Sequence, residues 1–178
     1  MKIRTFIAVD IPEDIKEDIE KVKKALRDIG DVKWVDRENI HITLEFLGNL
    51  EPGEVERLKE ALSRGLEGER KFSLTTGGIG AFPSLSSPRV IWVGVEGEGI
   101  KRLHDRVEGI VKGLGLKVEE REFSPHITIG RARRNIKGFI GGVEIPKKSF
   151  IIDGVNLMRS DLTPKGPIYT VLLRVDLK

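Results

Sequence analysis

The spacing of apolar residues predicts three amphipathic helices. Apolar positions recur every three or four residues over 15–29, 55–66 and 100–114, with charged residues between them. The first two segments follow prolines, Pro12 and Pro52, and all three end near glycines, as helices commonly do. Because each segment has one apolar and one charged face, we expect each helix to pack on a sheet with its other side in water.

Short apolar or alternating runs between the helices predict strands. The predicted strands cover residues 3–9, 32–35, 40–47, 72–79, 90–95, 117–131, 150–159 and 168–177. The segment 163–167, Thr-Pro-Lys-Gly-Pro, is typical of a chain reversal and would join the last two strands.

The order of these elements indicates an approximate duplication. The first half runs strand, helix, strand, helix, strand, and the second half repeats this order with an irregular segment, 135–146, in place of its second helix. We therefore expect a single domain over 1–178 with approximate halves 1–80 and 89–178. The loop 80–88 contains two prolines and three serines and is the expected boundary between two lobes.

Two of the three histidines lie in identical His-Ile-Thr triplets, 85 residues apart (126 − 41). Because side chains alternate along a strand, His41 and Thr43 share one face, as do His126 and Thr128. Histidine titrates near neutrality, so two imidazoles that flank one phosphorus atom can act as acid and base. The threonine hydroxyls can hold the non-bridging oxygens. The pattern points to metal-independent acid–base chemistry on a phosphate ester.

Basic residues directly follow the second triplet. Arg131 begins the densest basic cluster of the chain, which runs to Lys137, and it is our candidate for a phosphate contact. Five residues separate Arg131 from His126, which places the two on opposite faces of a regular strand. Gly130 would have to end or bulge the strand to turn Arg131 inward.

Composition removes several classes of function. The 178 residues include no cysteine, so disulfides, thiolate metal ligands and a cysteine nucleophile are excluded. A net charge of +3 is too small for nucleic-acid binding by charge alone. No apolar run approaches the roughly 20 residues of a membrane span, and the N-terminus reads as a strand rather than a signal peptide. We expect a cytoplasmic protein, and abundant Lys, Arg and Glu without Gln indicate a thermophilic source.

The motifs as a whole resemble a known family. HITLEFLG and SPHITIGR are similar to the two His-x-Thr signatures of the 2H phosphoesterase superfamily. More closely, the chain resembles the RNA 2′,3′-cyclic phosphodiesterases, also called 2′-5′ RNA ligases. RTFIAVDIPEDI, PRVIWVGV and SDLTPKGPIYTVLL match further landmarks of that family in the same order, so the resemblance covers essentially the whole chain.

The resemblance implies a bilobal α+β fold, in which each lobe is an antiparallel sheet with outer helices, around a central cleft with pseudo-two-fold symmetry. It implies hydrolysis of RNA 2′,3′-cyclic phosphate ends to 2′-phosphates, with His41 as proton donor and His126 as proton acceptor. Thr43 and Thr128 would hold the phosphate. The expected partner is RNA with a cyclic phosphate end, bound by a monomer that uses no cofactor or metal. The reverse path would give 2′-5′ ligation.

Other readings stay open. The fold could serve as a non-catalytic RNA-end-binding module. It could also act on ADP-ribose cyclic phosphate or 2′-5′ oligoadenylates, because the triplets would contact only the phosphate of a substrate. Glu45, which strand alternation places on the face of His41, makes a metal site a weaker alternative. His104 has charged neighbours and is expected on the surface. Three strand aromatics are expected in the core, although each could stack on a base: Trp34, Phe46 and Trp92.

Overall fold

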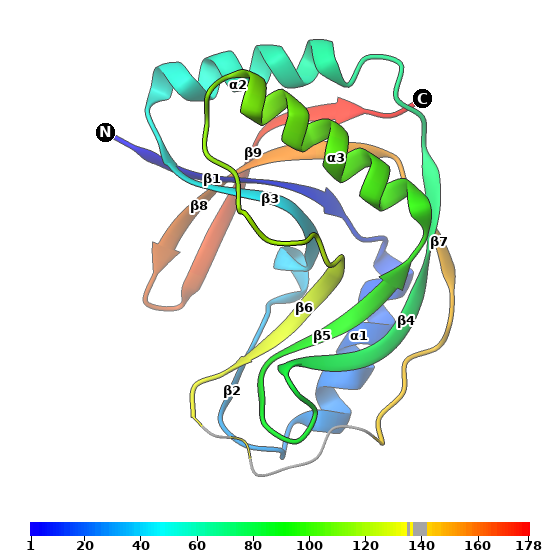
Figure 1. Ribbon diagram of the computed structural model, residues 1–178. Helices are drawn as coiled ribbons and strands as arrows, with labels where there is room; N and C mark the ends of the chain where they lie inside the picture. Colours follow the sequence, from blue (N-terminus) through cyan, green and yellow to red (C-terminus); the bar gives the residue numbers. More distant parts are fainter. Residues whose placement is uncertain (135, 137–141) are drawn as a thin grey trace.

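The computed structural model describes residues 1–134, 136 and 142–178, and among these it contains each of the three predicted helices (Figure 1). The elements are, in chain order, β1 (Ile3–Asp10), α1 (Glu13–Leu26), β2 (Val32–Trp34), a 3-10 turn (Arg37–Asn39), β3 (His41–Leu50), α2 (Pro52–Gly65), β4 (Phe72–Pro83), β5 (Pro88–Glu96), α3 (Glu98–Gly113), β6 (His126–Ala132), β7 (Ser149–Ile152), β8 (Gly154–Thr163) and β9 (Gly166–Asp176).

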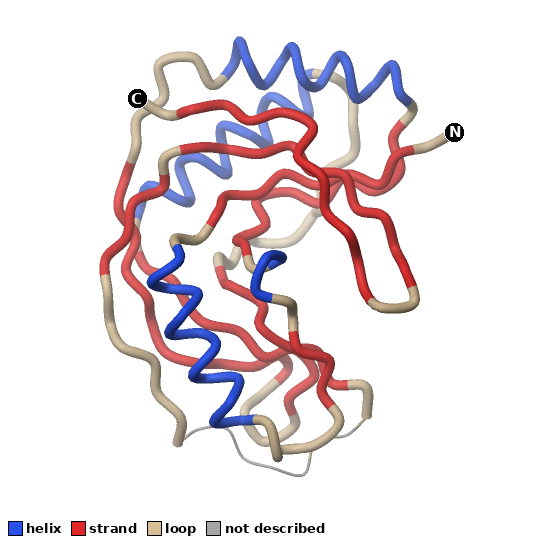
Figure 2. The backbone as a smooth tube through the Cα atoms, turned by 180° about the vertical axis from the view of Figure 1, so that it is seen from behind, coloured by secondary structure: helices blue, strands red, loops and turns tan. Residues whose placement is uncertain are grey.

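The strands form one curled antiparallel sheet. Its order is β7-β4-β5-β6-β3-β1-β8-β9, and β2 pairs with β6 outside this path. Helices α2 and α3 pack together and against β9, β3 and β4, whereas α1 lies along the part of the curled sheet that contains β4 and β5 (Figures 1 and 2). This arrangement confirms the α+β fold and its two lobes. One lobe contains β7, β4, β5 and β6, and the other contains β3, β1, β8 and β9.

The lobes differ from the two halves of the sequence. Strands β1 and β3 from the first half share a lobe with β8 and β9 from the second half. The expected boundary at 80–88 is wrong, because β4 and β5 pair with each other up to Pro83 and Pro88 and form a hairpin within one lobe. The lobes meet instead where β3 pairs with β6, through the pair Ile42–Ile127.

Two predicted strands differ from the observed ones in their bounds. The prediction over 117–131 holds only from His126, since residues 116–125 carry no regular secondary structure. The prediction over 150–159 is interrupted at Asp153, where the chain leaves β7, paired with β4, and enters β8, paired with β1. Alternation shows which residues can form a strand, but a strand also needs a partner. Half of the segment 135–146, including Lys137, lies outside the described residues.

The apolar faces of the three helices and of the sheet join in one core. The middle residues of both triplets, Ile42 and Ile127, are 0% exposed in this core. Their burial fixes the orientation of both strands, and the neighbouring histidines and threonines must therefore face away from the core. Among the described residues, no helix combines the length and the apolar character needed to cross a membrane.

Candidate active site

The two triplets are related by a local two-fold axis. Ile42 of β3 pairs with Ile127 of β6 in an antiparallel register. An antiparallel pair has a two-fold axis perpendicular to the sheet, and this axis places residue 42 + k on residue 127 + k. It therefore relates His41 to His126 and Thr43 to Thr128. All four polar side chains lie on the same face of the sheet, opposite the buried isoleucines, as the alternation predicts.

Both imidazoles are held by the same backbone contact. His41 Nδ1 lies 2.6 Å from the carbonyl oxygen of Asn39, and His126 Nδ1 lies 2.7 Å from that of Ser124. A carbonyl oxygen only accepts, so Nδ1 of each ring carries the proton and donates. In the neutral ring this leaves Nε2 with its lone pair, ready to accept or carry a second proton. Thr43 Oγ1 lies 2.8 Å from Nε2 of His41 and donates to it in that state.

The surroundings of His41 lower its pKa below the ordinary value. Burial is the largest cause, and the positive charges of Arg131 and His126 act in the same direction. The hydrogen bond to Asn39 and the carboxylate of Asp10 oppose this shift and raise the pKa. The influence of His126 and Arg131 on His41 also means that both lie within electrostatic reach of His41.

A β-bulge directs Arg131 toward the histidines. In the pairing of β5 with β6, Trp92 lies opposite Thr128 and Ile91 opposite Gly130, so Ile129 is an extra residue without a partner. One extra residue reverses the alternation, and Arg131 shares the face of Thr128 rather than that of Ile127. The sequence analysis required the strand to end or bulge at Gly130. The bulge lies one residue earlier, at Ile129, and the strand continues to Ala132.

A second bulge, in β3, overturns the prediction for Glu45. Ala8 pairs with Thr43 and Ile7 with Glu45, so Leu44 is the extra residue. Glu45 is thereby turned to the buried face, away from Thr43, and is only 3% exposed. A metal site made of His41 and Glu45 is excluded by this geometry.

His104 is buried, which also corrects the prediction. It lies within the apolar stripe of α3, between Ile100 and Val107, and only 7% of it is exposed. Its spacing of four from Ile100 and three from Val107 places it on the buried face despite its charged neighbours. Its ring lies beside Glu45, on the side of β3 opposite the triplets.

Aromatic rings flank each histidine in a matched way. Phe6 and Tyr169 lie with ring centroids 5.1 and 5.6 Å from His41. Phe82 and Trp92 lie 5.3 and 6.2 Å from His126. Phe82 is 39% exposed and Tyr169 is half-buried, so both offer ring surface next to the histidines. Phe82 and Tyr169 were not among the predicted site residues, although Tyr169 lies in the landmark SDLTPKGPIYTVLL and Phe82 in the loop 80–88.

Two polar residues next to His41 bond to other protein groups. Asn39 is buried, and its side-chain amide donates to the carbonyl of Pro167 at 3.1 Å while its own carbonyl accepts from His41. It thus ties the first triplet to the start of β9, close to Tyr169. Asp10 pairs with His41 across β1 and β3 and accepts from Asn156 at 2.9 Å.

The remaining candidates lie outside the immediate site. Trp34 packs against Gly130, where a Cβ atom would lie 2.7 Å from the indole ring. The guanidinium of Arg4 lies 4.6 Å above the ring of Phe46. Arg133 and Arg134 lie 3.6 and 3.9 Å from the carboxylate of Asp31, so this acid balances their charge.

Comparison with known proteins agrees with this duplicated site. A family model described as LigT like Phosphoesterase matches residues 9–92 and again residues 93–169, so each match contains one triplet. The fold and site define a phosphoesterase, and the chain belongs to the LigT-like phosphoesterase family.

An RNA 2′,3′-cyclic phosphodiesterase of Thermotoga maritima is 36% identical over 175 residues, which cover 96% of this chain and 93% of the relative. A crystal structure of a Thermus thermophilus protein superimposes with a TM-score of 0.85 and 29% identity over 98% of both chains. The Escherichia coli LigT structure complexed with 3′-AMP gives a TM-score of 0.80 and 26% identity over 99% of both.

Proposed function

We propose that this protein hydrolyses RNA 2′,3′-cyclic phosphate ends to 2′-phosphates by acid–base catalysis with two histidines. The observation that carries the proposal is the two-fold relation of His41 and His126, each with its Nδ1 proton bound to a backbone carbonyl. Two Nε2 atoms are thus free to exchange protons with one bound phosphoryl group. The names of the Thermotoga maritima relative and the 3′-AMP complex of E. coli LigT support a ribonucleotide substrate.

The proposed reaction is an in-line displacement at phosphorus. Nε2 of His126 accepts a proton from water as the water oxygen forms a bond to phosphorus. Nε2 of His41 donates its proton to the 3′ oxygen as the P–O3′ bond breaks. The product is a 2′-phosphate with a free 3′ hydroxyl, and solvent returns both imidazoles to their starting states. The assignment of acid to His41 and base to His126 rests on the resemblance to the family, because the local geometry is symmetric.

The charged and hydroxyl groups of the site would bind the phosphate. Thr43 and Thr128 supply donors beside each imidazole, and the bulge at Ile129 adds the guanidinium of Arg131 on the same face. A bound anion would also raise the pKa of His41, which burial lowers in the free enzyme, and so would favour the protonated acid. Phe82 and Tyr169 are placed to contact the nucleosides on either side.

Ligation uses the same groups. When a 5′ hydroxyl of RNA replaces water, its attack on the cyclic phosphate gives a 2′-5′ phosphodiester, and strain in the cyclic ester drives the step. Cleavage of that linkage is the reverse path, with the roles of the two histidines exchanged. Water is present at far higher concentration than any RNA end, so we expect hydrolysis to dominate.

The test is turnover of a nucleoside 2′,3′-cyclic phosphate in the presence of EDTA. We expect the 2′-monophosphate as the product, separated from the 3′ isomer by chromatography, at a rate that chelation leaves unchanged. Binding without turnover would favour an RNA-end-binding module, and loss of activity on chelation would favour a metal enzyme.

Parallel assays with ADP-ribose cyclic phosphate and 2′-5′ oligoadenylates measure the substrate preference. We expect the highest kcat/KM for RNA ends. A higher value for another phosphodiester would keep the chemistry and replace the substrate. We further expect a cytoplasmic monomer, which size-exclusion chromatography with light scattering would test for the oligomeric state.

A further inference from the structure

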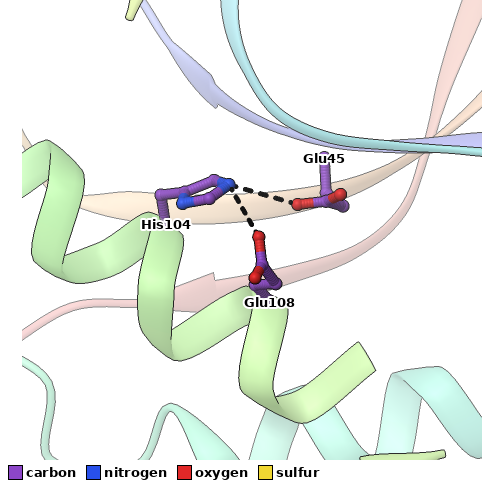
Figure 3. A group of neighbouring side chains, drawn as sticks. All are labelled: Glu45, His104 and Glu108. Carbon is purple, nitrogen blue, oxygen red and sulfur yellow. Dashed lines mark ion pairs between the residues drawn. The ribbon is translucent and has the colours of Figure 1, made fainter. Parts of the chain in front are cut away.

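A cluster of metal-ligating side chains lies on the face of β3 opposite the triplets. It consists of Glu45 from β3 with His104 and Glu108 from α3, and Figure 3 shows the three side chains converging on one point. His104 and Glu108 are four residues apart, so the helix places them on the same face. One ligand atom from each residue can be chosen such that all three lie within 4.8 Å of one another.

The distances fit a shared ion better than hydrogen bonds. Nε2 of His104 lies 3.3 Å from Oε2 of Glu45 and 3.5 Å from Oε2 of Glu108. Charge-assisted N–H···O bonds are usually about 2.7–2.9 Å long. Two ligands that each lie about 2.0–2.1 Å from a tetrahedral Zn²⁺ are separated by about 3.3–3.4 Å. The separation of 3.3 Å matches this tetrahedral edge, and that of 3.5 Å is slightly longer.

The His104 ring is oriented as in metal-ligating histidines. Its Nδ1 lies 3.1 Å from a carboxylate oxygen of Asp105, which accepts the proton of that nitrogen. The lone pair of Nε2 is then directed between Glu45 and Glu108, an arrangement common where a carboxylate supports a zinc-bound histidine. The ring of Phe123 stacks on the imidazole at a centroid distance of 4.0 Å and an interplanar angle of 4°.

A buried carboxylate oxygen of the cluster lacks a hydrogen bond. Within the described part of the chain, Oε2 of Glu45 has no hydrogen-bond partner, although the residue is only 3% exposed and His104 Nε2 lies 3.3 Å from it. Its other oxygen accepts from the backbone N–H of Glu119 at 3.1 Å. Because a buried carboxylate oxygen without a hydrogen bond is costly, a cation between it and His104 would satisfy it. Glu108 is a quarter exposed and leaves a path from solvent.

We propose that Glu45, His104 and Glu108 form a structural binding site for a divalent transition-metal ion, Zn²⁺ by its donor set of one imidazole and two carboxylates. The site would connect β3 and α3 to the segment 116–125, through Glu119 and Phe123, just before His126. It lies on the opposite face of β3 from His41, so the ion takes no part in catalysis. The sequence suggested a metal site only with Glu45 on the face of His41, because the bulge in β3 that brings Glu45 to His104 depends on the pairing with β1.

Cobalt spectroscopy tests the site directly. The purified protein is stripped with EDTA, transferred to chelator-free buffer and titrated with Co²⁺, whose visible absorption reports tetrahedral coordination. We expect a strong band at one equivalent that Zn²⁺ abolishes by displacement. The band should be absent in His104→Gln and Glu108→Gln. It should persist in His126→Ala, which removes the competing imidazole at the triplets.

A matched control distinguishes loss of a metal ligand in Glu108→Gln from loss of an ion pair on a helix. Glu108 also pairs with Lys112, and Glu56 makes a similar pair with Lys59 on α2, so Glu56→Gln loses an ion pair without touching His104. Glu56→Gln should retain the band. No band in the wild-type protein would overturn the proposal, as would a band that is lost in His126→Ala and kept in His104→Gln.

Two further measurements keep the proposal testable if a core variant folds poorly. Asp105→Asn changes a largely exposed side chain and should weaken Co²⁺ binding roughly 10–100-fold, as loss of such supporting carboxylates does. Zn²⁺ should also raise Tm and slow trypsin cleavage after Lys117 and Arg121 in wild type but not in Glu108→Gln. The proposed site would be contradicted if Asp105→Asn bound Co²⁺ as tightly as the wild-type protein and if Zn²⁺ left trypsin cleavage of the wild-type protein unchanged.

Discussion

The two triplet strands begin alike and then differ. In β3 and β6 the His-Ile-Thr triplet is followed at once by a bulge, at Leu44 and at Ile129, which are again 85 residues apart (129 − 44). The bulge reverses the alternation in both strands. In β6 it places Gly130 against the core and Arg131 on the face of the site. In β3 the equivalent positions are Glu45, turned to the buried face, and Phe46.

The difference shows how a duplicated site acquires two unlike halves. In the proposed reaction the two copies of the triplet would supply a proton donor and an acceptor, and Arg131 of β6 would supply the cation that binds the phosphate. The buried position after each bulge has no role in the proposed reaction. It holds a glycine under Trp34 in β6 and a carboxylate beside His104 in β3.

Replacement of either triplet histidine should have the largest effect on activity. We expect His41→Ala and His126→Ala each to lower turnover of a cyclic phosphate by roughly 10²–10⁴-fold, the usual loss of a general acid or base. A phosphodiester with a p-nitrophenolate leaving group departs without protonation. It should restore most of the rate of His41→Ala and little of that of His126→Ala, and the opposite result would exchange the two roles.

Removal of the arginine tests what the bulge in β6 contributes. Loss of a charge-assisted contact costs about 1.5–3 kcal/mol, so Arg131→Ala should lower kcat/KM roughly 10–100-fold. Arg133→Ala is the matched control, because its guanidinium lies by Asp31. Equal effects of the two variants in steady-state kinetics would refute a specific role for Arg131.

The glycine after the bulge should be required for stability. In Gly130→Ala the new Cβ would lie 2.7 Å from the indole of Trp34 and 2.9 Å from a methyl of Val32. Such overpacking costs about 1–3 kcal/mol of the free energy of unfolding. Gly78→Ala is the control, because a Cβ there meets nothing within 4 Å. Denaturant unfolding of both variants measures the difference, and equal midpoints would contradict the close packing.

The smallest expected effect is a shift in the pH optimum of kcat/KM, and its sign tests the role of His41. His41 must be protonated to act as an acid, so a lower pKa moves the activity optimum toward acidic pH. Burial is the main cause of the lowered pKa, Arg131 adds to it, and Asp10 opposes it. Arg131→Ala should therefore shift the optimum upward by roughly a few tenths of a pH unit, and Asp10→Asn should shift it downward. Shifts of the same sign would contradict His41 as the acid.

Much of the fold follows from local pattern. The three helices were predicted to within a few residues, because their apolar stripes and flanking prolines and glycines are local signals. The strands were less certain, since a strand exists only where it finds a partner. Residues 117–125 alternate but pair with no strand, and Asp153 interrupts an apolar run where the chain changes lobes.

The site was predictable where it depends on alternation alone. Within each triplet, alternation places the histidine and the threonine on the face opposite the middle isoleucine, and this much follows from the sequence alone. Phe82 and Tyr169 come from a hairpin and from β9, and their approach to the histidines depends on long-range pairing.

The two-fold axis and the two bulges of the site depend on the pairing of strands that are far apart in the sequence. The pairing of Ile42 with Ile127 set the two-fold axis, and the registers of β3 with β1 and of β6 with β5 set the bulges. The bulges turned Arg131 to the face of the triplets and Glu45 toward His104. A bulge is a mismatch between two strands, so neither strand alone contains it. That is why reading along the chain placed the four triplet side chains correctly and misplaced the glutamate two residues further on.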